Sequence, residues 1–134
     1  TSRGEKNYKK YGSKGIREEA EDGFSRVLLG LDLLKKIEKE TNLDCALNGT
    51  LFYFMSFVED SNIIKRGGLE GLEFLKETSG YVLKNKLYEN EDGMREIQKI
   101  NEEYKRRNLS PGGCADFLIL TLYFYLLEGN IDWL

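Results

Sequence analysis

The sequence contains one proline in 134 residues, Pro111. Proline is the residue that most strongly interrupts α-helices, so nearly every other position of this chain is free to be helical. Apolar residues between 24 and 37 recur at steps of three and four, with charged residues between them. This spacing predicts an amphipathic helix with one buried face.

Four more segments show helical spacing, at 44–58, from 68 to about 87, at 94–104 and at 110–127. The segment 44–58 is apolar on all sides, which predicts a central, buried helix. A further helix is expected at about 3–11, followed by a turn between Gly12 and Gly15. No alternating Val/Ile/Thr-rich run bounded by turns is present. The prediction is one all-α domain over 1–134, with about six helices around a central apolar helix.

The overall charge excludes some classes of function. With 20 basic and 23 acidic side chains, the net charge is -3, which argues against a nucleic-acid-binding protein. The chain has no histidine, which excludes catalysis by Ser-His or Cys-His pairs and any histidine-ligated zinc site. Two distant cysteines, Cys45 and Cys114, favour a reduced, cytoplasmic protein. The longest apolar run, 117–127, is too short to cross a membrane.

A polar junction precedes the last helix, at Ser110-Pro111-Gly112-Gly113 with Asp116 close behind. Serine is a favoured N-cap and proline a favoured first helical residue. Two glycines in the first turn would leave backbone amides open to a phosphate at the positive end of the helix dipole. The alternative is an ordinary helix cap, although a cap does not explain two glycines that each cost about 1 kcal/mol relative to alanine.

A second junction carries Lys65 and Arg66 immediately before Gly67-Gly68, where a helix is expected to start. Two cations beside free amides would suit a triphosphate. Just upstream, Asp60 and Asn62 offer oxygen ligands of the kind that hold Mg²⁺. The alternative here is a polar loop with a helix cap.

Two further junctions lie near the start of the chain and give weaker signals. Arg17 and Glu19 stand just before an apolar helical stripe, and Glu19 could turn inward there. The alternative is a solvated acidic helix face. Glu5 follows Gly4 in the first junction.

These junctions, in this order and at about these separations, resemble the C-terminal half of the triphosphoribosyl-dephospho-coenzyme A synthase family. The resemblance covers nearly the whole chain. It rests on four groups of residues: Gly4-Glu5 with Tyr8 and Tyr11-Gly12; Gly15-Ile16-Arg17 with Glu19-Ala20 and Gly23-Phe24; Asp60-Ser61-Asn62 with Arg66-Gly67-Gly68; and Ser110-Pro111-Gly112-Gly113 with Ala115-Asp116. The family usually has histidine where this chain has Arg3 and Lys65, and serine where it has Cys114.

The resemblance implies a reaction between two substrates, ATP and 3'-dephospho-coenzyme A. The triphosphoribosyl group passes to the 2'-hydroxyl of the acceptor and adenine is released, which makes the prosthetic-group precursor of citrate lyase or malonate decarboxylase. Candidate roles follow for the residues above. Glu19 is the first candidate for the base, with Glu5 or Asp60 next. The candidate phosphate ligands are Arg17, Lys65, Arg66, Gly67, Gly68, Ser110, Gly112 and Gly113, and Mg²⁺ is expected at Asp60, Asn62 and Asp116.

Proteins of this family are about twice as long as this chain. The resemblance therefore implies that an N-terminal half is missing, that the chain is part of a larger all-α enzyme, and that the isolated fragment is inactive. Its expected partners are that half and, alternatively, further copies of itself. Two other functions stay open: a Mg²⁺-dependent all-α nucleotide pyrophosphohydrolase and a non-catalytic helical interaction domain.

Overall fold

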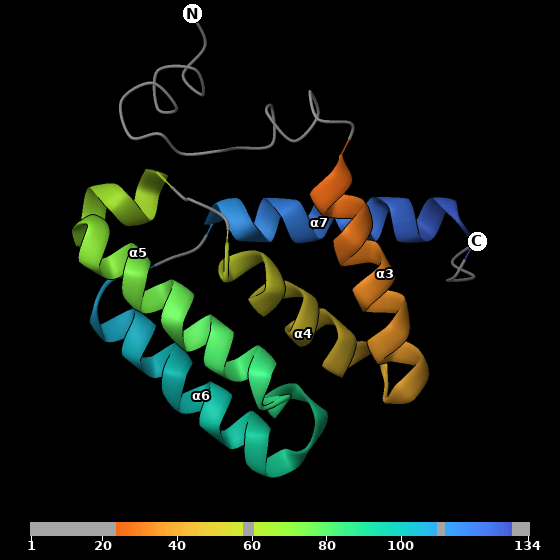
Figure 1. The fold of residues 1–134 in the computed structure, drawn as a ribbon, viewed down its shortest axis with the longest axis horizontal. Helices are drawn as coiled ribbons and strands as arrows, with labels where there is room; N and C mark the ends of the chain where they lie inside the picture. The colour runs from red at the N-terminus through yellow and green to blue at the C-terminus, as the bar shows by residue number, and fades with distance from the viewer. Residues whose placement is uncertain (1–23, 58–60, 110–111, 130–134) are drawn as a thin grey trace, which may run out of the picture.

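The computed structural model describes residues 24–57, 61–109 and 112–129, without the side chains of 61, 62, 112 and 113. This part of the chain is helical and contains no β-strand, which confirms the all-α prediction (Figure 1). The helix expected at 3–11 lies outside it. The elements in chain order are α3 (Ser25–Glu40), α4 (Leu43–Met55), α5 (Ser61–Lys84), the short 3₁₀ helix η1 (Leu87–Glu89), α6 (Glu91–Arg106) and α7 (Gly112–Leu127).

Helix α4 is the centre of the fold, as its apolar sequence predicts. It contacts α3, α5, η1 and α7, and in Figure 1 it lies between α3 and α5. Phe52, Phe54 and Met55 are buried at its C-terminal end. The close approach of α3 to α4 requires a glycine, because a Cβ at Gly30 would lie 2.5 Å from Cζ of Phe54.

Helix α3 crosses α7 and is held to it at several points. Phe24 and Phe124 make an edge-to-face ring contact with centroids 5.6 Å apart. Further along α3, Lys35 Nζ lies 3.0 Å from a carboxylate oxygen of Glu128. The buried Tyr125 donates its hydroxyl hydrogen to Glu38. These contacts fix the side of α7 that faces the core.

The connection between α5 and α6 is built on an asparagine cap and a glycine. Asn90 accepts a hydrogen bond from the backbone N–H of Gly93 at 2.8 Å, which caps α6. A Cβ at Gly93 would lie 1.9 Å from the carbonyl oxygen of Leu87. Only glycine lets η1 fold back so closely onto the start of α6.

Helix α6 ends in a Schellman motif. The N–H of Leu109 donates to the carbonyl of Tyr104 at 2.8 Å, and the N–H of Asn108 donates to that of Lys105 at 3.0 Å. Asn108 has the left-handed conformation that the motif requires, with φ 58°. The motif turns the chain back on itself, and Leu109 is buried beneath the turn.

Helix α5 differs from the prediction at both ends. Residues 61–67, expected as a turn before a helix start at Gly67-Gly68, are already helical, and the helix ends at Lys84 rather than at about 87. The reason for the early start is burial of Ile63, which is 0% exposed and anchors the first turn to the core. Gly68 then interrupts the helix with φ 67° and ψ -170°, so α5 consists of two helical segments joined at a kink.

Candidate functional site

The two strongest junctions in the sequence lie side by side in the fold. Leu109 is the last described residue before α7, and its side chain packs against two glycines of α5. A Cβ at Gly67 would lie 2.8 Å from Cδ2 of Leu109, and a Cβ at Gly71 would lie 3.0 Å from it. Figure 1 shows the N-terminal end of α7 beside the C-terminal end of α4. The first part of α5 lies to the left of this end of α7 in the view. The junctions before α5 and before α7 therefore form one region of the surface.

The two glycines of the α5 junction have different roles. Gly67 makes room for Leu109, so its missing side chain is explained by packing. Gly68 has open space where a Cβ would be, and its backbone conformation is one that other residues rarely adopt. Gly68 is therefore needed for the kink itself. After the kink a second helical segment follows, and the first amides of a helix are in general not used by intrahelical hydrogen bonds.

Lys65 and Arg66 are both exposed on the last turn of α5 before the kink. A structural interpretation of these cations is available, because positive charge near a helix C-terminus interacts favourably with the helix dipole. The same position also places both side chains at the surface, immediately before the kink.

The α7 junction follows the prediction where it is described. Gly112 and Gly113 form the first turn of α7, and Asp116 is exposed one turn later. Cys114, where the family usually has serine, is fully buried. Its neighbourhood includes the buried Tyr104, and burial is the main reason that the pKa of this tyrosine lies above its usual value.

Several candidate residues lie outside the described part of the chain: Glu5, Arg17, Glu19, Asp60 and Ser110. Asn62 belongs to the first turn of α5, but its side chain is not described. Within 24–57, 61–109 and 112–129 no group of three or more His, Cys, Asp or Glu side chains is placed to hold a metal ion. The Mg²⁺ ligand set and the catalytic carboxylates therefore stay predictions.

A groove of about 600 Å³ adjoins this region and was not predicted from the sequence. Leu109 lines it at the junction, Leu51 and Met55 of α4 form an apolar wall, and α6 supplies the polar wall. Its remaining lining residues are Gln98, Asn101, Glu102, Tyr104, Lys105 and Asn108. No sequence signal could have identified the groove, because it depends on how α4 and α6 are placed relative to one another.

None of the helices in the described part of the chain is long and apolar enough to span a lipid bilayer.

Residues 1–133 match the family described as ATP:dephospho-CoA triphosphoribosyl transferase (CitG). A probable 2-(5''-triphosphoribosyl)-3'-dephosphocoenzyme-A synthase of Streptococcus equi subsp. equi is 37% identical over 129 residues, which are 96% of this chain and 44% of that protein. The synthase of Klebsiella pneumoniae is 34% identical over 124 residues, which are 91% of this chain and 41% of that protein.

No solved structure matches the chain. The chain spans less than half the length of these curated relatives. The family match nevertheless extends over nearly all of its residues and includes all four junctions. The chain therefore belongs to the ATP:dephospho-CoA triphosphoribosyl transferase family.

Proposed function

We propose that the chain forms part of an enzyme that transfers the triphosphoribosyl group of ATP to 3'-dephospho-coenzyme A. The observation that carries the proposal is the packing of Leu109 against Gly67 and Gly71, which brings two candidate phosphate-binding junctions into one region. Family membership supplies the identity of the substrates.

The proposed reaction is a displacement at C1' of the ATP ribose. The 2'-hydroxyl oxygen of the acceptor forms the new bond to C1', the bond from C1' to adenine breaks, and the hydroxyl proton passes to a base. Adenine leaves and takes up a proton, while the triphosphate stays on the transferred ribose. The site must therefore align two substrates, neutralise the triphosphate and accept one proton. Glu19 is proposed as the base, with Glu5 and Asp60 as the alternatives.

Triphosphate binding is assigned to the region around the α5 kink and the start of α7. Lys65 and Arg66 supply positive charge at the surface, and the amides after Gly68 and at Gly112-Gly113 supply hydrogen-bond donors. Arg17 and Ser110 complete the proposed set. The exposed Asp116, together with Asp60 and Asn62, would hold Mg²⁺, which supplies further neutralisation of phosphate charge when bound.

The acceptor is assigned to the groove between α4 and α6. The groove adjoins Leu109, so a substrate whose phosphates lie at the junctions could extend into it. Its mixture of side-chain amides with the apolar Leu51 and Met55 matches the pantetheine arm of 3'-dephospho-coenzyme A, which carries two amides and a dimethyl group. We also propose a cytoplasmic location, where ATP and the acceptor are available.

Arg66→Ala tests the phosphate site directly. Lys99→Ala is the matched control, because Lys99 is also exposed but lies on α6 facing a different groove. A charge-assisted contact to phosphate is worth about 2 kcal/mol, so Arg66→Ala should weaken ATP binding by about 30-fold while Lys99→Ala leaves it unchanged. Titration of each variant with ATP gives the two dissociation constants. If the two variants have the same dissociation constant for ATP, Arg66 is not a phosphate ligand.

Product analysis, with the complementary region of the Streptococcus equi synthase added to the chain, separates the alternatives. Free adenine with an intact triphosphate supports group transfer, whereas pyrophosphate with a nucleoside monophosphate supports a pyrophosphohydrolase. Absence of any ATP binding would favour a non-catalytic interaction domain.

A further inference from the structure

Helix α7 has an apolar surface that the described part of the fold does not cover. Ile119, Tyr123 and Leu127 are 64%, 58% and 64% exposed, and they follow one another at intervals of four residues. Residues at this spacing lie on one face of a helix. We refer to Ile119, Tyr123 and Leu127 as the α7 outer stripe.

The opposite side of α7 packs against the rest of the fold. Phe117, Thr121 and Tyr125 are buried there, and α7 contacts α3 and α4. A helix that is apolar all round is typical of the core of a larger protein, whereas a surface helix has a polar outer face. Leu28 and Leu29 of α3, the helix that crosses α7, are also 45% and 58% exposed. Isolated exposed apolar residues are common, but a stripe of large side chains marks an interaction surface.

We propose that the α7 outer stripe binds the portion of the synthase that lies outside this chain. The matched region is 96% of this chain but only 44% of the Streptococcus equi relative, so more than half of that protein has no counterpart here. In the relatives that portion belongs to the same polypeptide, which gives it a much higher effective concentration at the stripe than a second copy would have. The proposal takes from the proposed function only the identity of the partner.

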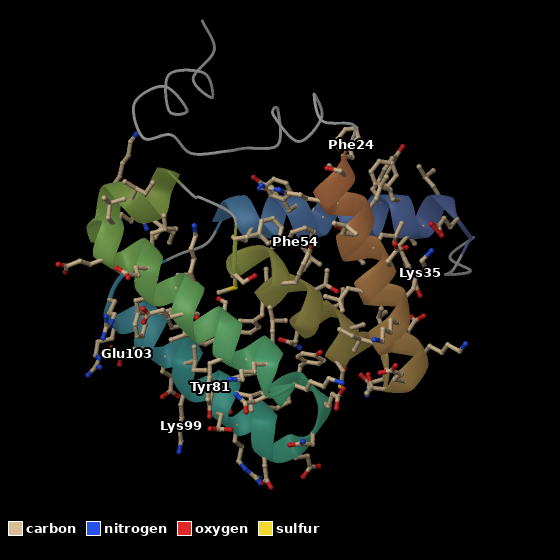
Figure 2. All side chains as sticks on the ribbon, in the orientation of Figure 1. Phe24, Lys35, Phe54, Tyr81, Lys99 and Glu103 are labelled. Atoms are coloured by element: carbon tan, nitrogen blue, oxygen red, sulfur yellow. The ribbon has the colours of Figure 1, made fainter. Side chains whose placement is uncertain are left out.

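The probe for this surface is the region of the Streptococcus equi synthase outside the 129 matched residues, produced as a separate polypeptide. The test variant is Tyr123→Lys, and the matched control is Tyr81→Lys. Tyr81 is 48% exposed and lies on α5, far from α7 in Figure 2, where its hydroxyl donates to Glu96. Binding of the probe to each 134-residue chain is measured by titration, and far-UV circular dichroism compares the helix content of the chains.

A lysine in the stripe should weaken binding of the probe at least tenfold, while the control changes it less than twofold. If Tyr123→Lys loses helix content, Ile119→Lys is tested in its place. Ile119 is 64% exposed, slightly more than Tyr123 at 58%, so a lysine there disturbs the fold less. Equal binding by the stripe and control variants, or no binding of the probe to the unaltered chain, would overturn the proposal. Self-association that the stripe variant abolishes, without a complex with the probe, would also overturn it and identify a second copy as the occupant.

These outcomes are independent of the catalytic proposal. The titration needs no turnover, so a stripe that does not bind leaves the assignment of the reaction unaffected. A stripe-dependent complex that releases no adenine from ATP and 3'-dephospho-coenzyme A would instead reject the proposed reaction alone.

Discussion

Gly68 and Gly80 lie in the same helix, and a Cβ at either position would meet nothing within 4 Å. They differ in backbone conformation, because only Gly68 has a positive φ. Gly68→Ala should therefore lower the free energy of unfolding by about 1–3 kcal/mol through backbone strain. Gly80→Ala should raise it by up to about 1 kcal/mol, since alanine is the better helix former.

Urea denaturation of the two variants measures both effects. The two variants also test the proposed phosphate site. If α5 straightens to relieve the strain in Gly68→Ala, Lys65 and Arg66 move away from the start of α7. We expect weaker ATP binding in Gly68→Ala only. If both alanines change stability by the same amount, the kink does not require glycine.

Tyr125 gives the fold a dependence on alkaline pH. Burial, followed by the hydrogen bond to Glu38 and the charge of Glu38, raises the pKa of Tyr125 to about 12 from a usual 10.0. The folded state thus favours the neutral phenol. The stability that this provides is complete below pH 10 and is lost as the pH rises towards 12.

Tyr125→Phe should therefore be less stable than the unaltered chain at pH 8, by about 1.5–3 kcal/mol for a hydrogen bond to a charged group. The difference should shrink between pH 10 and 12. Chemical denaturation at several pH values measures it, with the exposed Tyr123→Phe as the control on the same helix. A difference that stays constant up to pH 12 would show that ionisation of Tyr125 is not linked to folding.

At the scale of elements, the end of α6 determines how α5 and α7 meet. The Schellman motif directs Leu109 onto Gly67 and Gly71. Leu87 is a useful comparison, because it is also a buried leucine, 7% exposed against 5% for Leu109, but lies at the opposite end of α6.

Leu109→Ala and Leu87→Ala should each lower the free energy of unfolding by about 2–4 kcal/mol, because each leaves a cavity in the core. Only Leu109→Ala should also weaken ATP binding, since it loosens the contact between the junctions. Thermal denaturation and ATP titration below the unfolding transition measure the two effects. A similar loss of ATP affinity in both variants would mean that binding follows overall stability rather than this contact.

At the scale of the whole molecule, the chain spans less than half the length of its curated relatives. We expect the 134-residue chain to release no adenine from ATP and 3'-dephospho-coenzyme A by itself. Adding the complementary region of the Streptococcus equi synthase should restore release, because the complete reaction needs residues from both parts. Adenine release by the chain alone would show that one half carries a complete site.

The sequence by itself determined the helical class, the central place of α4 and the extent of α7. These follow from local properties: the near absence of proline, the three-to-four spacing of apolar residues, and the apolar character of 44–58 on every side. The family resemblance was also readable from the sequence, because ordered motifs survive in the chain independently of how it folds.

The tertiary structure decided what local properties do not specify. A helix at 61–67 was missed because its first turn depends on burial of Ile63, and the packing role of Gly67 depends on Leu109, which is about forty residues away in the chain. The groove between α4 and α6 and the α7 outer stripe likewise exist only because of how the helices are packed. Burial and proximity are properties of the assembled fold, since they depend on residues that are distant in the sequence.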